Sequence, residues 1–396
     1  MSALPATAAR AGLLPLPGHP AAHLGEGAAG RLGDALTALG AEKVLLVHGR
    51  ASYRHSGAQE LVEQWAGRYK TEHYDGVRPN PELAQVREAL TLARRFRPDV
   101  VVGIGGGSSL DVAKAVAVLG AQDADPRDCL LRPELITEPR WSALVLVPTT
   151  AGSGSELTRF ATVYVDGVKH SLDQDQVRAD LVLVDPALSA SLPLRESVTG
   201  GLDALSQAIE SYWAVAATET SRELALGALD LLLPALARAA DRAGFDDPGV
   251  RAEMAHGASL AGAAIDLTRT TAAHALSYEL TAALGLPHGT AVALHLKWLL
   301  GRHAAATEDQ CRHPEGAAAL RRRVSHIQEL AARHTPGDVQ QLLVRLLTLG
   351  GQPTDLRRLA LPAERWRAPL TAALGSGRAG NNPCVLTESD VLRFLV

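Results

Sequence analysis

Several features are scarce or missing in this sequence of 396 residues, and each gap argues against a class of protein. It has only three cysteines, Cys129, Cys311 and Cys384, which lie far apart without CxxC spacing. This argues against a disulfide framework or a thiolate zinc site, and it favours a reducing, cytoplasmic compartment. The formal net charge is -4 and the basic residues form no dense patch, so we do not expect a nucleic-acid partner.

Long apolar runs are also missing. None approaches the roughly 20 residues that cross a bilayer, so no membrane partner is expected. The N-terminal segment has no unbroken apolar stretch before Pro15 and Pro17, which argues against a signal peptide. No internal repeat or low-complexity segment is present.

The chain is longer than one hydrophobic core usually serves, so we expect two domains. Its first half alternates β-rich runs with helical patterns, which is typical of a mostly parallel sheet, and Asp166-Gly167 predicts a hairpin. From Pro186 onward the pattern is helix after helix. The sequence therefore predicts an α/β domain over 1–185 and an all-helical domain over 186–396. The predicted strands are 43–49, 99–105, 143–150 and 180–185, and the predicted helices of the first half are 57–70, 81–96 and 106–120.

The segment "GIGGGSSLDVAK" (103–114) follows a strand and opens a helix. It matches neither GxGxxG nor the P-loop spacing. Three consecutive glycines, Gly105, Gly106 and Gly107, cost backbone entropy that a plain turn does not require, which indicates a loop that approaches a pyrophosphate. Ser108 and Asp111 suit the start of a helix with or without a ligand.

A second loop, "PTTAGSGSE" (148–156), also follows a strand and offers the hydroxyls of Thr149, Thr150 and Ser153. Taken alone it is an ordinary loop. Two such loops at the ends of successive parallel strands predict a nucleotide crevice at the carboxyl edge of the sheet.

The helical half carries a set of metal-ligand types. Asp203 and Gln207 lie four residues apart in "GLDALSQAIESYW", and His274 and His288 flank a predicted helix and a "GLPHG" turn. Oxygen and imidazole donors from several helices hold divalent ions in helical domains, although any one of these residues alone is more often a packed polar side chain.

The four quoted motifs, with "HALSYELTAALGLPHG" as the last, resemble in order and spacing those of the iron-dependent (group III) alcohol dehydrogenase family. The resemblance implies an N-terminal Rossmann-like dinucleotide-binding domain and an all-α C-terminal domain, as in dehydroquinate synthase. It also implies an NAD(P)-dependent alcohol dehydrogenase or aldehyde reductase, in which Fe²⁺ or another divalent metal such as Zn²⁺ polarises the carbonyl. The implied ligands are Asp203, Gln207, His274 and His288.

Two residues depart from the family pattern, because Gln207 and Tyr278 stand where the family has histidines. A neutral amide oxygen binds iron or zinc less well than imidazole, so the metal is expected to be weakly held. Tyr278 is a candidate proton donor, and the alternative is a tyrosine packed on its helix.

Within the family, "FATVYVDGVKHSL" and "RAGNNPCVLTESDV" look most like the phosphonoacetaldehyde reductase branch. That resemblance implies reduction of an aldehyde bearing a phosphonate, which needs cationic partners. The alternatives are a relative acting on uncharged or carboxylated substrates such as maleylacetate, a non-catalytic dinucleotide-binding protein, and a lyase of the dehydroquinate synthase type. A homo-oligomer, most simply a dimer, is expected. The candidate phosphonate ligands are Arg159, Lys169, Arg269 and Arg378. The alternative for each of them is a solvated surface charge.

We expect the residues that determine the choice between NADH and NADPH just after the first predicted strand, where NAD enzymes tend to carry an acid. The stretch "VHGRASYRHSG" instead has Arg50 and Ser52 and no acid. This favours NADPH over NADH, and Lys169 is a further candidate for the cofactor.

Overall fold

A computed structural model describes residues 13–14, 21–359 and 370–395, which form two compact units, Met1–Leu192 and Pro193–Val396. The first unit contains a seven-stranded sheet of order β1-β2-β9-β6-β5-β3-β4, which is parallel except for the β1–β2 pair. The predicted parallel sheet is therefore confirmed. Its strands are β1 (Leu13–Leu14), β2 (Ala21–Leu24), β3 (Lys43–His48), β4 (Lys70–Tyr74), β5 (Val100–Gly105), β6 (Ala143–Pro148) and β9 (Leu181–Val184).

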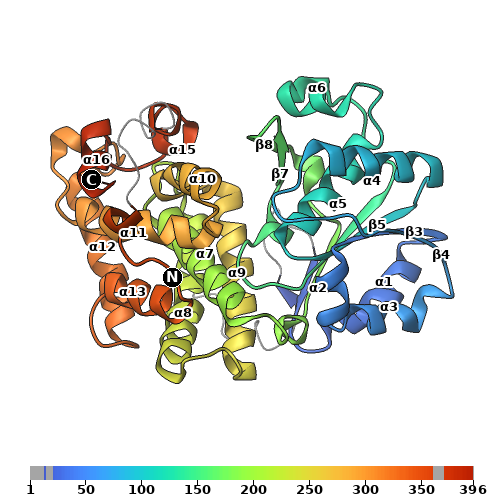
Figure 1. Cartoon of the computed structure of the whole chain (residues 1–396), viewed down its shortest axis with the longest axis horizontal. Coiled ribbons are helices and arrows are strands. Elements are labelled where there is room, and N and C mark those ends of the chain that lie inside the picture. The colour runs from blue at the N-terminus through green and yellow to red at the C-terminus, as the bar shows by residue number, and fades with distance from the viewer. Residues whose placement is uncertain (1–12, 15–20, 360–369, 396) are drawn as a thin grey trace. The chain divides into compact units, whose positions relative to one another are not determined.

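Helices cover both faces of this sheet, with α1 and α3 on one side and α4 and α5 on the other (Figure 1). The central strands are accordingly buried on both faces, which explains their unbroken apolar runs. Gly103 allows α5 to pack closely on β5, because a Cβ there would lie 2.7 Å from the Cβ of Ala113. The helices are α1 (Leu32–Ala38), α2 (Arg50–His55), α3 (Ala58–Ala66), α4 (Leu83–Phe96), α5 (Gly107–Leu119) and α6 (Pro126–Leu131).

The predicted hairpin is also confirmed. Strands β7 (Phe160–Val165) and β8 (Val168–Asp173) pair antiparallel around Asp166-Gly167, and both turn residues have positive φ. Short 3₁₀ turns connect the elements of this unit: η1 (Ala28–Arg31), η2 (Pro133–Leu135), η3 (Ser155–Leu157), η4 (Asp175–Val177) and η5 (Pro186–Ser189).

The second unit is helical in its described residues. Helix α7 contacts α8, α9, α11, α12 and α13 and is buried without interruption from Gly201 to Trp213. A helix buried on all sides must satisfy its polar residues internally. The helices are α7 (Leu194–Trp213), α8 (Glu219–Arg242), α9 (Pro248–Thr268), α10 (Ala272–Leu284), α11 (His288–Ala304), α12 (Gly316–Ala332), α13 (Val339–Leu349), α15 (Gly377–Gly380) and α16 (Glu388–Leu395), with 3₁₀ turns η6 (Glu308–Gln310) and η7 (Leu356–Leu359).

Among the helices that the structure describes, none combines the length and the apolar character needed to cross a membrane.

Two buried histidines of the helical unit predict acid sensitivity. Burial lowers the pKa of His295 and of His303 to about 3, so both are neutral in the folded chain at neutral pH. In the unfolded chain they take up protons below about pH 6.5. Their contribution to stability is therefore present above about pH 6.5 and is lost as the pH falls towards 3, by at most about 1.4 kcal/mol per pH unit for each histidine.

Urea unfolding between pH 7.5 and pH 5 measures this effect. We expect His303→Gln to flatten the loss of stability with acid, because it removes one group that takes up a proton on unfolding. His334→Gln, at an exposed position, serves as the control. Identical pH dependence in His303→Gln and the unmodified protein would contradict the assignment.

Candidate functional site

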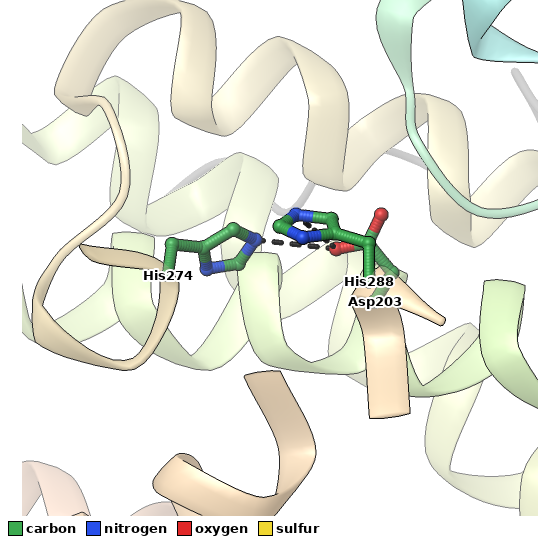
Figure 2. A group of neighbouring side chains, drawn as sticks. All are labelled: Asp203, His274 and His288. Atoms are coloured by element: carbon green, nitrogen blue, oxygen red, sulfur yellow. Dashed lines mark hydrogen bonds and ion pairs between the residues drawn. The ribbon is translucent and has the colours of Figure 1, made fainter. Parts of the chain in front are cut away.

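Three side chains from three helices converge in the second unit. Asp203 on α7, His274 on α10 and His288 on α11 each offer one ligand atom, and these atoms lie within 4.8 Å of one another (Figure 2). The Oδ1 of Asp203 is 3.2 Å from Nε2 of His274 and 3.9 Å from Nε2 of His288. Asp203 and His274 are buried, whereas about a third of the His288 side chain is exposed. The structure thus brings together residues that are far apart in the sequence.

Gln207 belongs to the same region of α7. It lies one helical turn after Asp203, and residues four apart share one face of a helix. Its side chain is buried, as is that of Asp203. One carboxylate oxygen and two imidazole nitrogens, held rigidly by three helices, form a donor set that fits a divalent transition-metal ion.

Glu210, which sequence reasoning missed, organises this cluster. Its carboxylate is fully buried and its Oε2 pairs with Nδ1 of His274. Its Oε1 accepts hydrogen bonds from Oγ1 of Thr271 at 2.6 Å and from the amide of Ala273 at 2.8 Å. With Nδ1 occupied by this bond, the Nε2 of His274 faces Asp203 and is the nitrogen placed to bind a metal. Glu210 lies two helical turns after Asp203 on the same helix, but only tertiary contacts show that it is buried.

The electrostatics of His274 follow from these two carboxylates. Burial alone would lower its pKa, but Glu210 and Asp203 outweigh burial and raise the pKa of His274 to about 9. Without a metal, the two carboxylates therefore stabilise a protonated imidazole. A divalent cation would take the place of that proton, and the same two carboxylates would stabilise its positive charge.

Tyr278 and Arg378 lie beside the cluster. The Tyr278 ring stacks on His288, with centroids 6.0 Å apart and planes inclined by 14°. The guanidinium carbon of Arg378 lies 5.6 Å from the centroid of the Tyr278 ring, and its Nε donates to Oγ1 of Thr270 at 3.1 Å. Of the four predicted phosphonate ligands, Arg378 is thus linked to the cluster through one aromatic ring.

Arg269 lies in the loop that leads into α10. Its φ of 63° and ψ of 177° belong to a region that residues other than glycine rarely adopt. The amide of Asn381 holds this loop by donating to the carbonyl oxygens of Thr268 at 2.8 Å and Thr270 at 3.1 Å. The strained residue is therefore fixed by contacts on both sides.

The other two candidate cations lie in the first unit. Arg159 forms ion pairs with Asp173 at 3.1 Å and Asp175 at 3.4 Å, so acids of the same unit already balance its charge. Lys169 lies on β8, half-buried, and its charge favours ionisation of Asp111.

The glycine loop joins β5 to α5, and each of its glycines has a close neighbour. A Cβ at Gly105 would lie 2.5 Å from Oγ of Ser109, and one at Gly107 would lie 2.9 Å from Oγ of Ser153. A Cβ at Gly106 would lie 3.2 Å from Thr150 of the second loop. The two predicted loops therefore lie side by side. No side chain caps α5, and Ser108 stands in its first turn, so its backbone N–H groups suit a pyrophosphate.

Lys114, a second residue that sequence reasoning missed, fastens the two loops together. It is fully buried, and its Nζ donates to Oγ of Ser155 at 3.1 Å and to the carbonyl oxygens of Thr158 at 2.9 Å and Phe160 at 3.0 Å. Asp111 adds to this network by accepting from Oγ of Ser155 at 2.7 Å. Burial raises the pKa of Asp111, although Lys114 opposes this rise. Thr149, at the start of the second loop, is buried.

The region after β3 contains an acid that the local sequence did not reveal. Arg50 begins α2, and its Nε donates to Oδ2 of Asp75 at 2.7 Å. Asp75 follows β4, which pairs in parallel with β3. The Arg50 guanidinium holds the pKa of Asp75 below its usual range. Both side chains and Arg78 line one pocket, while Ser52 in the same helix donates to the carbonyl of Gly49 at 3.2 Å.

The chain is similar to known proteins over both of its units. The model of the family "Iron-containing alcohol dehydrogenase" matches residues 20–186, and that of the "Fe-containing alcohol dehydrogenase family, C-terminal" matches residues 197–396. The chain is 39% identical over 334 residues to a phosphonoacetaldehyde reductase of Streptomyces viridochromogenes, covering 81% of each chain. It is 34% identical over 284 residues to long-chain-alcohol dehydrogenase 1 of Geobacillus thermodenitrificans, covering 71% of each.

Among solved structures, the crystal structure of a sulfoacetaldehyde reductase from Bifidobacterium kashiwanohense in complex with NAD+ superposes with a TM-score of 0.80. Its sequence is 26% identical, and the match covers 94% of this chain and 95% of that one.

The contacts of Glu210 predict its effect on metal binding. In Glu210→Gln one acceptor oxygen becomes an NH₂ donor that faces N–H and O–H donors, so His274 loses its fixed orientation. We expect the affinity for Zn²⁺ or Co²⁺ to fall roughly 10- to 100-fold. Competition titration against a chromophoric chelator, starting from metal-stripped protein, measures this affinity.

Glu196→Gln, at an exposed position of the same helix, is the matched control and should keep the original affinity. The pKa of His274 in the metal-free variant, followed by NMR, should also fall from about 9. An unchanged metal dissociation constant in folded Glu210→Gln would show that the carboxylate has no part in the site.

Proposed function

Because the chain belongs to the iron-containing alcohol dehydrogenase family, we propose that it reduces phosphonoacetaldehyde to 2-hydroxyethylphosphonate, with NADPH as the reductant and a divalent metal ion in the helical unit. The enzyme class is that of its family and relatives, an NAD(P)-dependent oxidoreductase acting on alcohols and aldehydes. The phosphonate substrate, the choice of NADPH and the role of each residue are the proposal.

The observation that carries the substrate proposal is the position of Arg378. Its guanidinium lies over Tyr278, which stacks on His288 of the metal cluster. A guanidinium can bind two oxygens of a phosphonate in a planar, bidentate manner. A two-carbon aldehyde is short, so its charged group and its carbonyl must be recognised by neighbouring side chains. Arg378 and the Asp203, His274 and His288 cluster are neighbours in this sense.

Names of relatives support an anionic substrate. One relative is called a phosphonoacetaldehyde reductase and a structural neighbour is called a sulfoacetaldehyde reductase, so both names describe small aldehydes with a charged oxygen-rich group. The long-chain-alcohol dehydrogenase named above supports the alternative, an uncharged substrate.

The reaction consumes an aldehyde, a hydride and a proton and yields a primary alcohol. When bound, NADPH supplies the hydride and a metal ion acts as a Lewis acid on the carbonyl oxygen. Asp203, Gln207, His274 and His288 would hold the metal, and the N–H groups at the start of α5 would bind the pyrophosphate. The Tyr278 hydroxyl, or solvent, would give the proton to the alkoxide.

The substrate proposal is tested by NADPH oxidation with a panel of aldehydes after metal reconstitution. We expect kcat/KM to be higher for phosphonoacetaldehyde than for butanal, and chelation to abolish both activities. In Arg378→Gln we expect kcat/KM for phosphonoacetaldehyde to fall roughly 10- to 150-fold, because hydrogen bonds to a charged group contribute about 1.5–3 kcal/mol. The value for butanal should change little.

Arg195→Gln, at an exposed position of α7, controls for the loss of one positive charge. Equal kcat/KM for the charged and uncharged aldehydes in the unmodified protein would refute the phosphonate proposal. Full activity in a verified metal-free preparation would refute the metal's role.

The choice of cofactor depends on the pair of Arg50 and Asp75. Arg50 suits the 2′-phosphate of NADPH, whereas Asp75 suits the ribose hydroxyls of NADH. We propose that Arg50 and Arg78, which line the same pocket, turn to the phosphate when NADPH binds.

Arg50→Ala should therefore raise KM for NADPH about tenfold or more while leaving KM for NADH nearly unchanged. Asp75→Asn should instead lower KM for NADPH, because Arg50 is released from its ion pair. Steady-state kinetics with both cofactors give the ratio. A preference for NADH in the unmodified protein would contradict this reading of the pocket.

A further inference from the structure

Two of the three cysteines lie opposite each other in the second unit. Cys311 follows η6 and Cys384 lies between α15 and α16, and the two form an isolated antiparallel bridge. Two hydrogen bonds flank this pair, from the amide of Arg312 to the carbonyl of Pro383 at 2.7 Å and from the amide of Val385 to the carbonyl of Gln310 at 2.9 Å. The cysteines therefore occupy the non-hydrogen-bonded type of antiparallel pair.

This register is suited to a disulfide. In a non-hydrogen-bonded pair the Cα atoms lie about 4.5 Å apart and the side chains approach closely. Disulfides join cysteines whose Cα atoms are roughly 4.4–6.8 Å apart. A pair of this type has the Cα spacing that a bond between the two sulfurs requires, and the flanking hydrogen bonds hold the two segments together.

The two thiols differ in access. Cys384 is 1% exposed, and burial raises its pKa to about 11. Cys311 is only half-buried, and the amide of His313 donates to its sulfur at 3.4 Å. Cys311 is therefore the thiol that an external reagent can reach first. Cys129 is buried in the first unit.

We propose that Cys311 and Cys384 are a redox-sensitive pair that closes to an intramolecular disulfide with a low-molecular-weight disulfide such as glutathione disulfide. The Cys311 thiolate attacks one sulfur of the oxidant, so the oxidant's S–S bond breaks and one thiol leaves. The Cys384 thiol then loses its proton and attacks the Cys311 sulfur, which releases the second thiol. Two protein thiols are oxidised and one disulfide is reduced to two thiols.

The disulfide would fasten a segment that supports the cluster of Asp203, His274 and His288. Asn381 and Asn382, just before Cys384, are anchored inside the unit: Asn381 holds the carbonyls on either side of the strained Arg269, and the amide of Asn382 lies 3.3 Å from Nε2 of His303. That loop leads into α10 and His274. The disulfide closes a loop of roughly 70 residues, so it should raise the melting temperature by roughly 5–10 °C.

The test uses the full chain carrying Cys129→Ser, which leaves only the two cysteines of the pair. After incubation with glutathione disulfide, we expect titratable thiols to fall from two to none and peptide mass spectrometry to find Cys311 linked to Cys384 within one chain. The melting temperature should rise, and dithiothreitol should reverse both changes.

Single variants in the same background test the order of attack. With Cys384→Ser, glutathione should remain attached to Cys311 without a rise in melting temperature. With Cys311→Ser, Cys384 should stay unmodified. Three results would overturn the proposal: a lasting glutathione adduct on Cys311 when Cys384 is present, a link between two chains only, or a disulfide that leaves the melting temperature unchanged. None of these readouts depends on the identity of the substrate.

Discussion

The bond between the buried Glu210 carboxylate and His274 is the constraint on which the helical unit's candidate site depends. Thr271, at the start of α10, makes no capping hydrogen bond with its own side chain. Glu210 on α7 takes that role from outside by accepting the amide of Ala273 in the first turn of α10. This one carboxylate therefore caps α10 and interacts favourably with the positive end of the helix dipole. It also orients the imidazole of His274 on the same helix. Removing it would disturb all three functions together.

In the first unit, a buried charge of the opposite sign likewise holds a neighbouring segment in place. Lys114 is fully buried on α5 and binds the carbonyls of Thr158 and Phe160. A buried ammonium group is costly unless all of its hydrogen bonds are made, so the loop from 149 to 160 must adopt the one shape that supplies these acceptors. That shape sets Thr150 and Ser153 against the glycine loop. In both units, a buried charge fixes the conformation of a neighbouring segment.

Motifs with strong local signals could be predicted from the sequence. The central strands have unbroken apolar runs because both faces of the sheet are covered. The family-like motifs pointed to Asp203, His274 and His288, whose side chains the structure brings together. Strand β4 was missed because "KTEHY" is an edge strand with few apolar residues. Asp75 was missed because only the pairing of β4 with β3 brings it next to Arg50. Glu210 and Lys114 were missed because charged residues on helices are usually solvated, and only tertiary contacts reveal that these two are buried.

The two departures from the family's histidine pattern have different physical consequences. Under the proposed function, Gln207 would replace one neutral ligand with another, so the charge of the site would stay unchanged and the harder donor would favour harder ions. Tyr278 replaces a potential nitrogen ligand with a flat aromatic ring, on which the Arg378 guanidinium rests. A protonated histidine there would repel the guanidinium. Under the proposed function, the tyrosine therefore supports a cation where a phosphonate requires it.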